Sequence, residues 1–338
     1  MSLLVRSFLA DAHPESRIRA RALPAGVLPD DLAMKMDRFE RRFVRKMGDS
    51  PAVVRVHARD FSLMYRSMGP AACFIATKPD GHILGASCMS CLRLRMPRGY
   101  VRRATVSANM SVLPEARHGA TLARLVGASF RWTVPRAFAS FSVIPEGSLS
   151  RPERFLPRLG LPGFSEFTGM TLVSFAAESA DDAAAGEIEV VGEARVRAMH
   201  RTFTRGMIAA VGGTPSMRSK RDPMWIALRD GSACGCIEDY EAAKRHEYIE
   251  GPGELTMNHV SFLGYRDHAS AGRLVRAALA ITARQGVQRL QFAVDRSIED
   301  ALVAGVSVPC DFRFPMRVVG FALGAMPRAP WSLNSSEI

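Results

Sequence analysis

The chain has 338 residues, of which 47% are hydrophobic and 23% charged, and it carries a formal net charge of +12. This composition is typical of a globular protein, and the length predicts two domains of about 150 residues each. No apolar run approaches the roughly 18 to 20 residues that a membrane-spanning helix needs, and residues 1–12 hold too short an apolar segment for a signal peptide. We therefore expect a cytoplasmic protein with no membrane partner.

The six cysteines indicate a reducing compartment. They lie in apolar or strand-like stretches and not in the dense framework of a small secreted domain. Two pairs are closely spaced, Cys88 with Cys91 and Cys234 with Cys236. A spacing of three along an extended strand points the two thiols to opposite faces, so no metal site is expected.

The basic charge is confined to one half of the chain. Residues 1–175 contain 26 Lys and Arg against 13 Asp and Glu, a difference of +13, whereas residues 176–338 contain 19 against 20, a difference of −1. Most of the cations are Arg, whose planar guanidinium suits phosphate recognition. The first half is therefore the part expected to meet an anionic partner.

The first half alternates strand and helix patterns. Alternating or β-branched runs predict strands, and a 3.6-residue apolar period predicts helices. In chain order the sequence predicts a strand at 18–22, a helix at 31–47, strands at 72–77, 83–94 and 101–112, a helix at 120–132, a strand at 137–144, a short helix at 151–159 and a strand at 164–175. The small, acidic stretch that follows is expected to be an exposed linker over 178–187, between a first domain at 1–177 and a second at 188–338.

The second half repeats this order of elements. It predicts a strand at 188–191, a helix at 193–206, strands at 225–228, 233–237 and 254–263, a helix at 270–285, a strand at 287–294 and a short helix at 298–304. A repeat of this length indicates two copies of one fold and not a solenoid, whose repeats are shorter.

Residues 104–125 are the most informative stretch. A β-branched run ends at Leu113 and Pro114, and Arg117, His118 and Gly119 lead directly into an apolar helical pattern. Free backbone N–H groups at the start of a helix, with an Arg beside them, favour the binding of a pyrophosphate.

This turn and the order of elements resemble the GCN5-related N-acetyltransferase (GNAT) superfamily, here in tandem. The family's turn has the form Arg/Gln-x-x-Gly-x-Gly/Ala, and its backbone amides hold the pyrophosphate of acyl-CoA. Arg117 matches, but Ala120 and Leu122 occupy the two glycine positions, where a Cβ limits the approach of phosphates. The resemblance implies an α/β fold of two tandem domains, each with a mixed, mostly antiparallel sheet flanked by helices, and acyl-CoA as co-substrate. The implied donor-site residues are Leu113, Arg117, His118, Gly119, Ala120, Thr121 and Ser148.

Two departures from the family affect the assignment of the site. The segment 154–161 resembles the family's Phe-Tyr-x-x-Leu-Gly-Phe, but Leu156 stands where many members carry the tyrosine that protonates the leaving thiolate. The proton must then come from water, another residue or the second domain. The corresponding turn of the second half lacks the Arg-x-x-Gly-x-Gly spacing. It also carries Asp267, whose negative charge disfavours the binding of an anion. The donor site is therefore assigned to the first half.

Acyl transfer to an amine needs a base, a polarised carbonyl and two oriented reactants. The strand predicted at 101–112 carries Asn109, and its counterpart in the second half, at 254–263, carries Asn258 and His259. These three residues are the catalytic candidates. His259 is the base by residue type, because the ordinary pKa of histidine is near 6.5. The alternative for His259 is a hydrogen-bonded strand histidine.

The expected function is transfer of an acyl group from acyl-CoA, or from phosphopantetheine on an acidic acyl carrier protein, to an amine of a small molecule or peptide. Two alternatives stay open: a Fem-type tRNA-dependent aminoacyl transferase, which also resembles two such lobes, and a non-catalytic acyl-CoA-binding module.

Two arginine groups are either a surface for the carrier protein or tRNA, or solvated faces. They comprise Arg38, Arg41, Arg42 and Arg45, and Arg93, Arg95, Arg98, Arg102 and Arg103. Similarly, Glu238, Asp239 and Glu241 are either a site for a cationic acceptor or a solvated face.

Overall fold

The computed structural model describes residues 18–46, 51–117, 120–148, 152–157 and 163–337. Its strands are β1 (Arg19–Ala22), β2 (Val53–His57), β3 (Ala71–Thr77), β4 (Ile83–Arg95), β5 (Val101–Val112), β6 (Ala139–Pro145), β7 (Ser165–Ala176), β8 (Ile188–Val190), β9 (Ile208–Ala210), β10 (Met224–Leu228), β11 (Ala233–Glu238), β12 (Lys244–Tyr248), β13 (Met257–Tyr265), β14 (Arg289–Asp295), β15 (Phe312–Ala322) and β16 (Trp331–Ser332).

The α-helices are α2 (Asp30–Glu40), α3 (Leu63–Arg66), α4 (Ala120–Thr133), α5 (Pro152–Phe155), α6 (Glu193–Phe203), α7 (Pro215–Arg218), α8 (His268–Arg284) and α9 (Glu299–Val306). Short 3-10 helices are η1 (Pro114–Ala116), η3 (Ala177–Ser179), η4 (Asp182–Glu187), η5 (Arg296–Ile298) and η6 (Ser335–Glu337). In this part of the chain, no helix is both long enough and apolar enough to cross a membrane.

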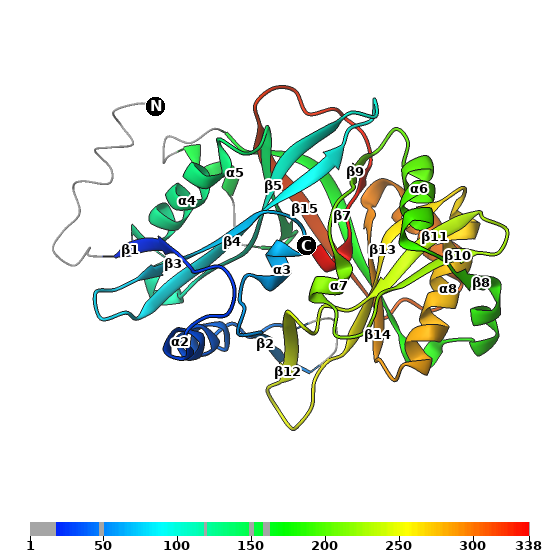
Figure 1. Ribbon diagram of the computed structural model, residues 1–338, viewed down its shortest axis with the longest axis horizontal. Helices are drawn as coiled ribbons and strands as arrows, with labels where there is room; N and C mark the ends of the chain where they lie inside the picture. Colours follow the sequence, from blue (N-terminus) through cyan, green and yellow to red (C-terminus); the bar gives the residue numbers. More distant parts are fainter. Residues whose placement is uncertain (1–17, 47–50, 118–119, 149–151, 158–162, 338) are drawn as a thin grey trace.

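One continuous sheet runs through both halves of the chain (Figure 1). We call the part of the fold built on the first half the first lobe, and the part built on the second half the second lobe. Its order is β1-β3-β4-β5-β6-β15-β7-β14-β13-β11-β10-β8, and β9 joins the end of β4. Only two neighbouring pairs in that order are parallel, β5 with β6 and β13 with β14. The predicted α/β fold with a mixed, mostly antiparallel sheet is confirmed.

The two halves of the chain exchange a strand at the centre of the sheet. The last strand of the first half, β7, pairs with β14 of the second half. In return β15, near the end of the chain, inserts between β6 and β7. The sequence patterns did not predict β15. The domain boundaries at 177 and 188 stay a prediction, and within the expected linker η4 packs against α8 with Ala184 buried.

Several other elements differ from the predictions. The helix expected over 31–47 ends at Glu40, because the chain turns there and Arg45 forms a β-bridge with Val53. The short elements α3, α7, β9 and β16 were not predicted. Nor were β2 and β12, which pair with each other across the two halves of the chain. Such strands depend on a distant partner and leave little local periodicity.

Each lobe has one place where parallel strands separate. β5 pairs with β6 only over Ala104–Ser107, and β13 pairs with β14 only over Met257–His259. Beyond the paired residues each lobe has a bulge, with a residue of positive φ: Asn109 at +52° and Phe262 at +53°. A bulge bends its strand and leaves an extra residue unpaired. The same device in both lobes confirms the tandem repeat.

Candidate functional site

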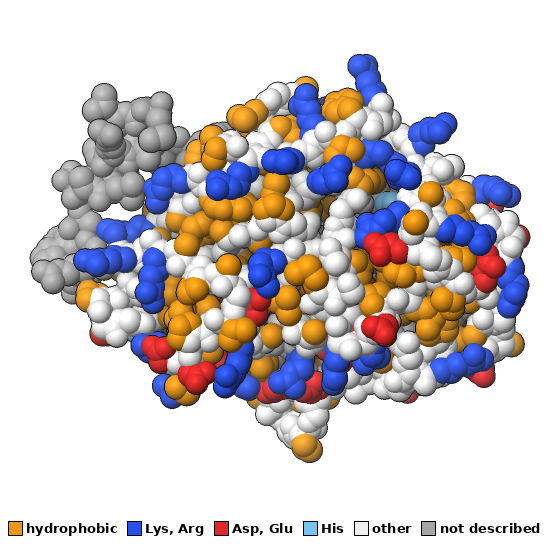
Figure 2. Space-filling view, viewed as in Figure 1, with side chains coloured by type: hydrophobic (Ala, Val, Ile, Leu, Met, Phe, Trp, Pro, Cys, Tyr) orange, Lys and Arg blue, Asp and Glu red, His pale blue; other side chains and the backbone are white. Residues whose placement is uncertain are grey.

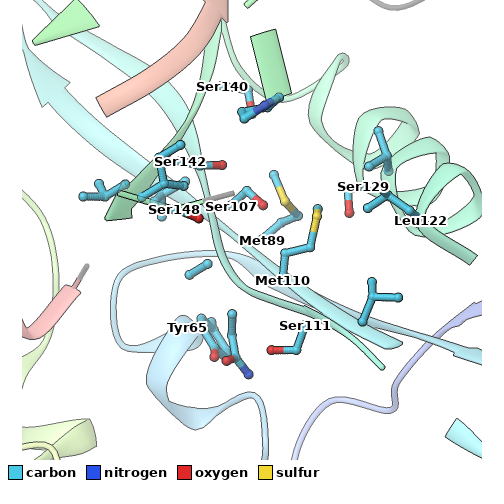
Figure 3. A pocket seen from close by; sticks show the side chains of 18 of the residues that line it. Tyr65, Met89, Ser107, Met110, Ser111, Leu122, Ser129, Ser140, Ser142 and Ser148 are labelled. Atoms are coloured by element: carbon cyan, nitrogen blue, oxygen red, sulfur yellow. The ribbon is translucent and has the colours of Figure 1, made fainter. Parts of the chain in front are cut away.

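A cavity of about 860 Å³ opens where β5 separates from β6. Figure 3 shows Met89 and Met110 near its centre, Leu122 and Ser129 projecting from α4 on one side, and Ser142 and Ser148 on another. The volume lies in the range of pockets for cofactor-sized ligands, and the walls are mainly apolar. The apolar lining residues include Met64, Met68, Met89, Val106, Met110, Leu122, Val126, Phe130, Leu156, Phe164 and Phe321.

The equivalent opening of the second lobe is filled by the chain's own C-terminal segment. The Ser335 hydroxyl is 2.9 Å from Nδ1 of His259 on β13, and it donates a hydrogen bond to the Gln291 carbonyl on β14 at 3.4 Å. The amide of Phe262, at the bulge, donates to Oδ1 of Asn334 at 2.8 Å. The repeated opening is thus a cavity in the first lobe and packed protein in the second.

Two of the predicted donor-site residues, Arg117 and Ser148, line this cavity. Arg117 is exposed and follows η1, and its Nε donates to the Val112 carbonyl at 3.3 Å. Ala120 begins α4, but Leu113 and Thr121 are buried and are not among the lining residues. His118 and Gly119 lie outside the described residues.

Of the three predicted catalytic residues, only Asn109 lines the cavity. Its Nδ2 donates to Oε1 of Glu40 at 3.2 Å, and its Oδ1 accepts from Arg55. Asn258 is buried elsewhere, where its amide donates to Gln285 at 2.7 Å and Thr282 at 3.2 Å. His259 is buried beside Ser335, and desolvation, followed by the charges of Lys244 and Arg218, holds the pKa of its ring well below the usual 6.5. The structure therefore does not bring the three residues together.

Sequence reasoning missed four ionisable residues that line the cavity: Tyr65, Arg55, Lys244 and Glu337. Burial raises the pKa of Tyr65 well above its usual value, so its phenol is protonated at neutral pH. Lys244 comes from β12 of the second half, and Glu337 comes from η6 at the end of the chain. No local motif marks these residues, because only tertiary contacts place them at the cavity.

The charged groups singled out in the sequence are largely engaged in internal contacts. Glu238 and Asp239 are buried and pair with Arg218 and Arg221, so they are not a solvated face. Arg95 is buried and donates to the carbonyls of residues 201 and 204. Figure 2 shows Lys and Arg side chains spread over the described part of the visible face, among apolar ones. Within the described residues, no group of three His, Cys, Asp or Glu side chains is arranged to hold a metal ion.

The site and the topology together define a tandem two-lobed α/β fold with one open cleft between parallel strands. No family model and no curated protein sequence match the chain. Solved structures do match it in fold. The N-myristoyltransferase of Saccharomyces cerevisiae with bound myristoyl-CoA is 7% identical at a TM-score of 0.62, over 96% of this chain and 88% of that one.

Two further structures match the chain in fold. A tandem GNAT protein from the clavulanic acid biosynthesis pathway is 12% identical at a TM-score of 0.55, over 92% of this chain and 100% of that one. The glucosamine N-acetyltransferase region of a fungal GH3 β-N-acetylglucosaminidase is 11% identical at 0.60, over 91% of this chain and 38% of that one. The chain has the tandem GNAT fold, and the predicted family resemblance is confirmed at the level of fold.

Proposed function

We propose that the protein is an N-acyltransferase that binds an acyl-CoA in the first-lobe cavity and transfers the acyl group to an amine. The observation that carries this proposal is the contrast between the lobes: the first opening is a cavity, and the second is filled by residues 331–337. The structurally similar N-myristoyltransferase holds myristoyl-CoA, which supports an acyl-CoA as the donor.

In this proposal the pyrophosphate lies at the start of α4 beside Arg117, and the pantetheine arm follows β5 toward the bulge at Asn109. A backbone N–H that the bulge leaves unpaired polarises the thioester carbonyl. The amine nitrogen attacks that carbon and the C–S bond breaks. Tyr65 is the proposed proton donor to the CoA thiolate, in place of the tyrosine replaced by Leu156. The proton lost by the amine passes through water to the Tyr65 phenolate, which restores the phenol.

The donor's acyl chain is expected to be longer than acetyl. Four methionines and four phenylalanines are among the lining residues, and methionine adapts to ligands of irregular shape. Each further CH₂ that enters such a wall contributes up to about 0.8 kcal/mol. We therefore expect the affinity for acyl-CoA to rise from acetyl-CoA to myristoyl-CoA, as measured by isothermal titration calorimetry.

Replacing Leu122 by tryptophan tests the location of the donor site. Leu122 projects from α4 into the cavity, so the larger side chain is expected to lower the affinity for myristoyl-CoA at least about tenfold. Leu323→Trp is the matched control, because Leu323 is 62% exposed and does not line the cavity. The melting temperature of each free variant checks that it folds. Equal affinity in both variants would contradict the assignment.

Thermal-shift measurements and a test for amide formation distinguish the acyltransferase from the tRNA-dependent transferase and from the binding module. A ligand that binds the native state raises the apparent stability, so each candidate donor can be compared by thermal shift at fixed salt. A shift with bulk tRNA and none with CoA esters would favour tRNA-dependent aminoacyl transfer. A shift with acyl-CoA, but no amide formed from any amine, would favour a non-catalytic binding module.

A further inference from the structure

Three basic side chains that line the first-lobe cavity lie near one another. Arg45 follows α2, Arg55 lies on β2, and Lys244 lies on β12, and all three line the cavity. In the β2–β12 pair Arg55 is opposite His246 and His57 is opposite Lys244, which places these side chains on one face of the ribbon. The two halves of the chain thus build this cluster jointly.

The cluster holds more positive than negative charge. Among the described residues, none of the three cations forms an ion pair. Arg55 donates to Asn109, Lys244 Nζ lies 4.4 Å from the centre of the Tyr240 ring, and the Nε atoms of Arg45 and Arg55 are buried without a hydrogen-bond partner. Lys244 is buried, and Arg45 and Arg55 are half-buried. Cations removed from water without a counter-ion are costly, and an anionic ligand would offset that cost.

The nearby carboxylates do not neutralise the cluster. Glu40 is the carboxylate whose charge acts on all three cations. Its Oε1 accepts a hydrogen bond from Asn109, and its Oε2 lies 3.7 Å from Nε2 of His57. Glu337 lines the cavity but is 3.4 Å from Arg218, in a separate buried ion pair. Burial, followed by the charges of Arg55 and Arg45, holds the pKa of Lys244 well below its usual value. A bound anion would offset the repulsion that Arg55 and Arg45 exert on the Lys244 ammonium.

The position of the cluster indicates which substrate carries the anion. Arg55 contacts Asn109, the bulge residue at which the proposed donor's thioester lies. The phosphates of the donor are assigned to Arg117 and the start of α4. An anion at the cluster would therefore belong to the acceptor, a few bonds away from the attacking nitrogen.

We propose that Arg45, Arg55 and Lys244 form a carboxylate subsite, and that the acceptor is an amino acid or short peptide whose carboxylate binds there. This inference rests on the proposed N-acyltransferase function. Guanidinium groups bind carboxylates through paired, charge-assisted hydrogen bonds, which suits Arg45 and Arg55 to this ligand. The subsite orients the amine toward the thioester and rejects amines that lack the carboxylate.

Matched acceptors test the subsite during turnover. With myristoyl-CoA as donor, phenylalanine is expected to be acylated with a kcat/KM about 10- to 100-fold above that of phenethylamine, which lacks only the carboxylate. Arg55→Met is expected to lower kcat/KM for phenylalanine at least about tenfold more than kcat/KM for phenethylamine, so that the preference for the carboxylate is lost. Equal kcat/KM for the two amines, or an equal loss for both in Arg55→Met, would overturn the proposal.

A binding measurement tests the subsite without turnover. The wild-type protein is expected to bind N-acetylphenylalanine at least tenfold more tightly than N-acetylphenethylamine, and Arg55→Met and Lys244→Met are each expected to remove this difference. Arg59→Met is the control, because Arg59 is 71% exposed and does not line the cavity. Equal binding of the two amides would overturn the subsite. Failure of myristoyl-CoA to bind would overturn the proposed function, but the affinities of the two amides could still be compared.

Discussion

Replacing Arg218 by alanine is expected to lower the free energy of unfolding by about 3–5 kcal/mol. The guanidinium is fully buried and binds both oxygens of Glu238, at 2.8 and 2.9 Å. It also donates to Ser67 Oγ of the first lobe at 3.0 Å and to Glu337 near the end of the chain at 3.4 Å. Its removal leaves two buried carboxylates without their counter-ion and disconnects three distant segments.

Urea denaturation at pH 7.5 measures this loss. Arg229→Ala is the matched control, because Arg229 is exposed and a surface arginine contributes about 1 kcal/mol or less. Adding Glu238→Gln to Arg218→Ala removes one of the unpaired charges and is expected to restore part of the stability. A loss below about 1 kcal/mol in Arg218→Ala would show that the buried network does not hold the segments together.

The protein is expected to lose stability steeply below about pH 6.5, because four of its histidines are buried in the neutral form. Desolvation is the largest cause of the lowered pKa in each of His57, His200, His246 and His259, and the pKa of His200 falls to about 3. Below pH 6.5 the unfolded chain binds protons at these rings and the folded chain does not. Their stabilising contribution is therefore complete above pH 6.5 and is lost as the pH falls toward the folded-state values.

In this range each such histidine changes the free energy of unfolding by roughly 1.4 kcal/mol per pH unit, and the four together by roughly 5 kcal/mol per pH unit. Glu40 and Glu337 act in the opposite direction, because burial raises the pKa of both carboxyls. Urea denaturation between pH 7.5 and 5 measures the net slope. His200→Gln is expected to reduce the slope by about one histidine's share, and His82→Gln, at an exposed position, serves as the control. A flat profile down to pH 5.5 would contradict the expectation.

The order of strands and helices was largely predictable because local patterns carry it. The apolar face of α8, the apolar run of β4 and the β-branched residues of β5 are visible in the sequence, and the bounds of these elements match the predictions within a few residues. The exceptions depend on distant partners. β15 was missed although it completes the first lobe, and β2 and β12 are defined mainly by their pairing with each other.

The candidate site was predictable only in part. Residues 104–125 contain the strand and the start of α4, so the place proposed for the donor site and the role proposed for Arg117 come from local sequence. Tyr65, Arg55 and Lys244 come from elements that carry no motif and that reach the cavity from both halves of the chain. Residue type indicated His259 as a base, but residue type does not reveal that the C-terminal segment covers it.

The sequence by itself determined the repeat, the mixed α/β character and the strand–turn–helix segment of the first lobe, because each depends on the period of side chains along a short stretch. The tertiary structure alone decided which strands are neighbours, which opening is a cavity and which buried charges lack a counter-ion. These properties depend on contacts between residues that are far apart in the chain, such as Ser335 with His259 and Arg55 with Asn109. Burial then sets the protonation of the histidines, since desolvation acts only once the lobes have packed.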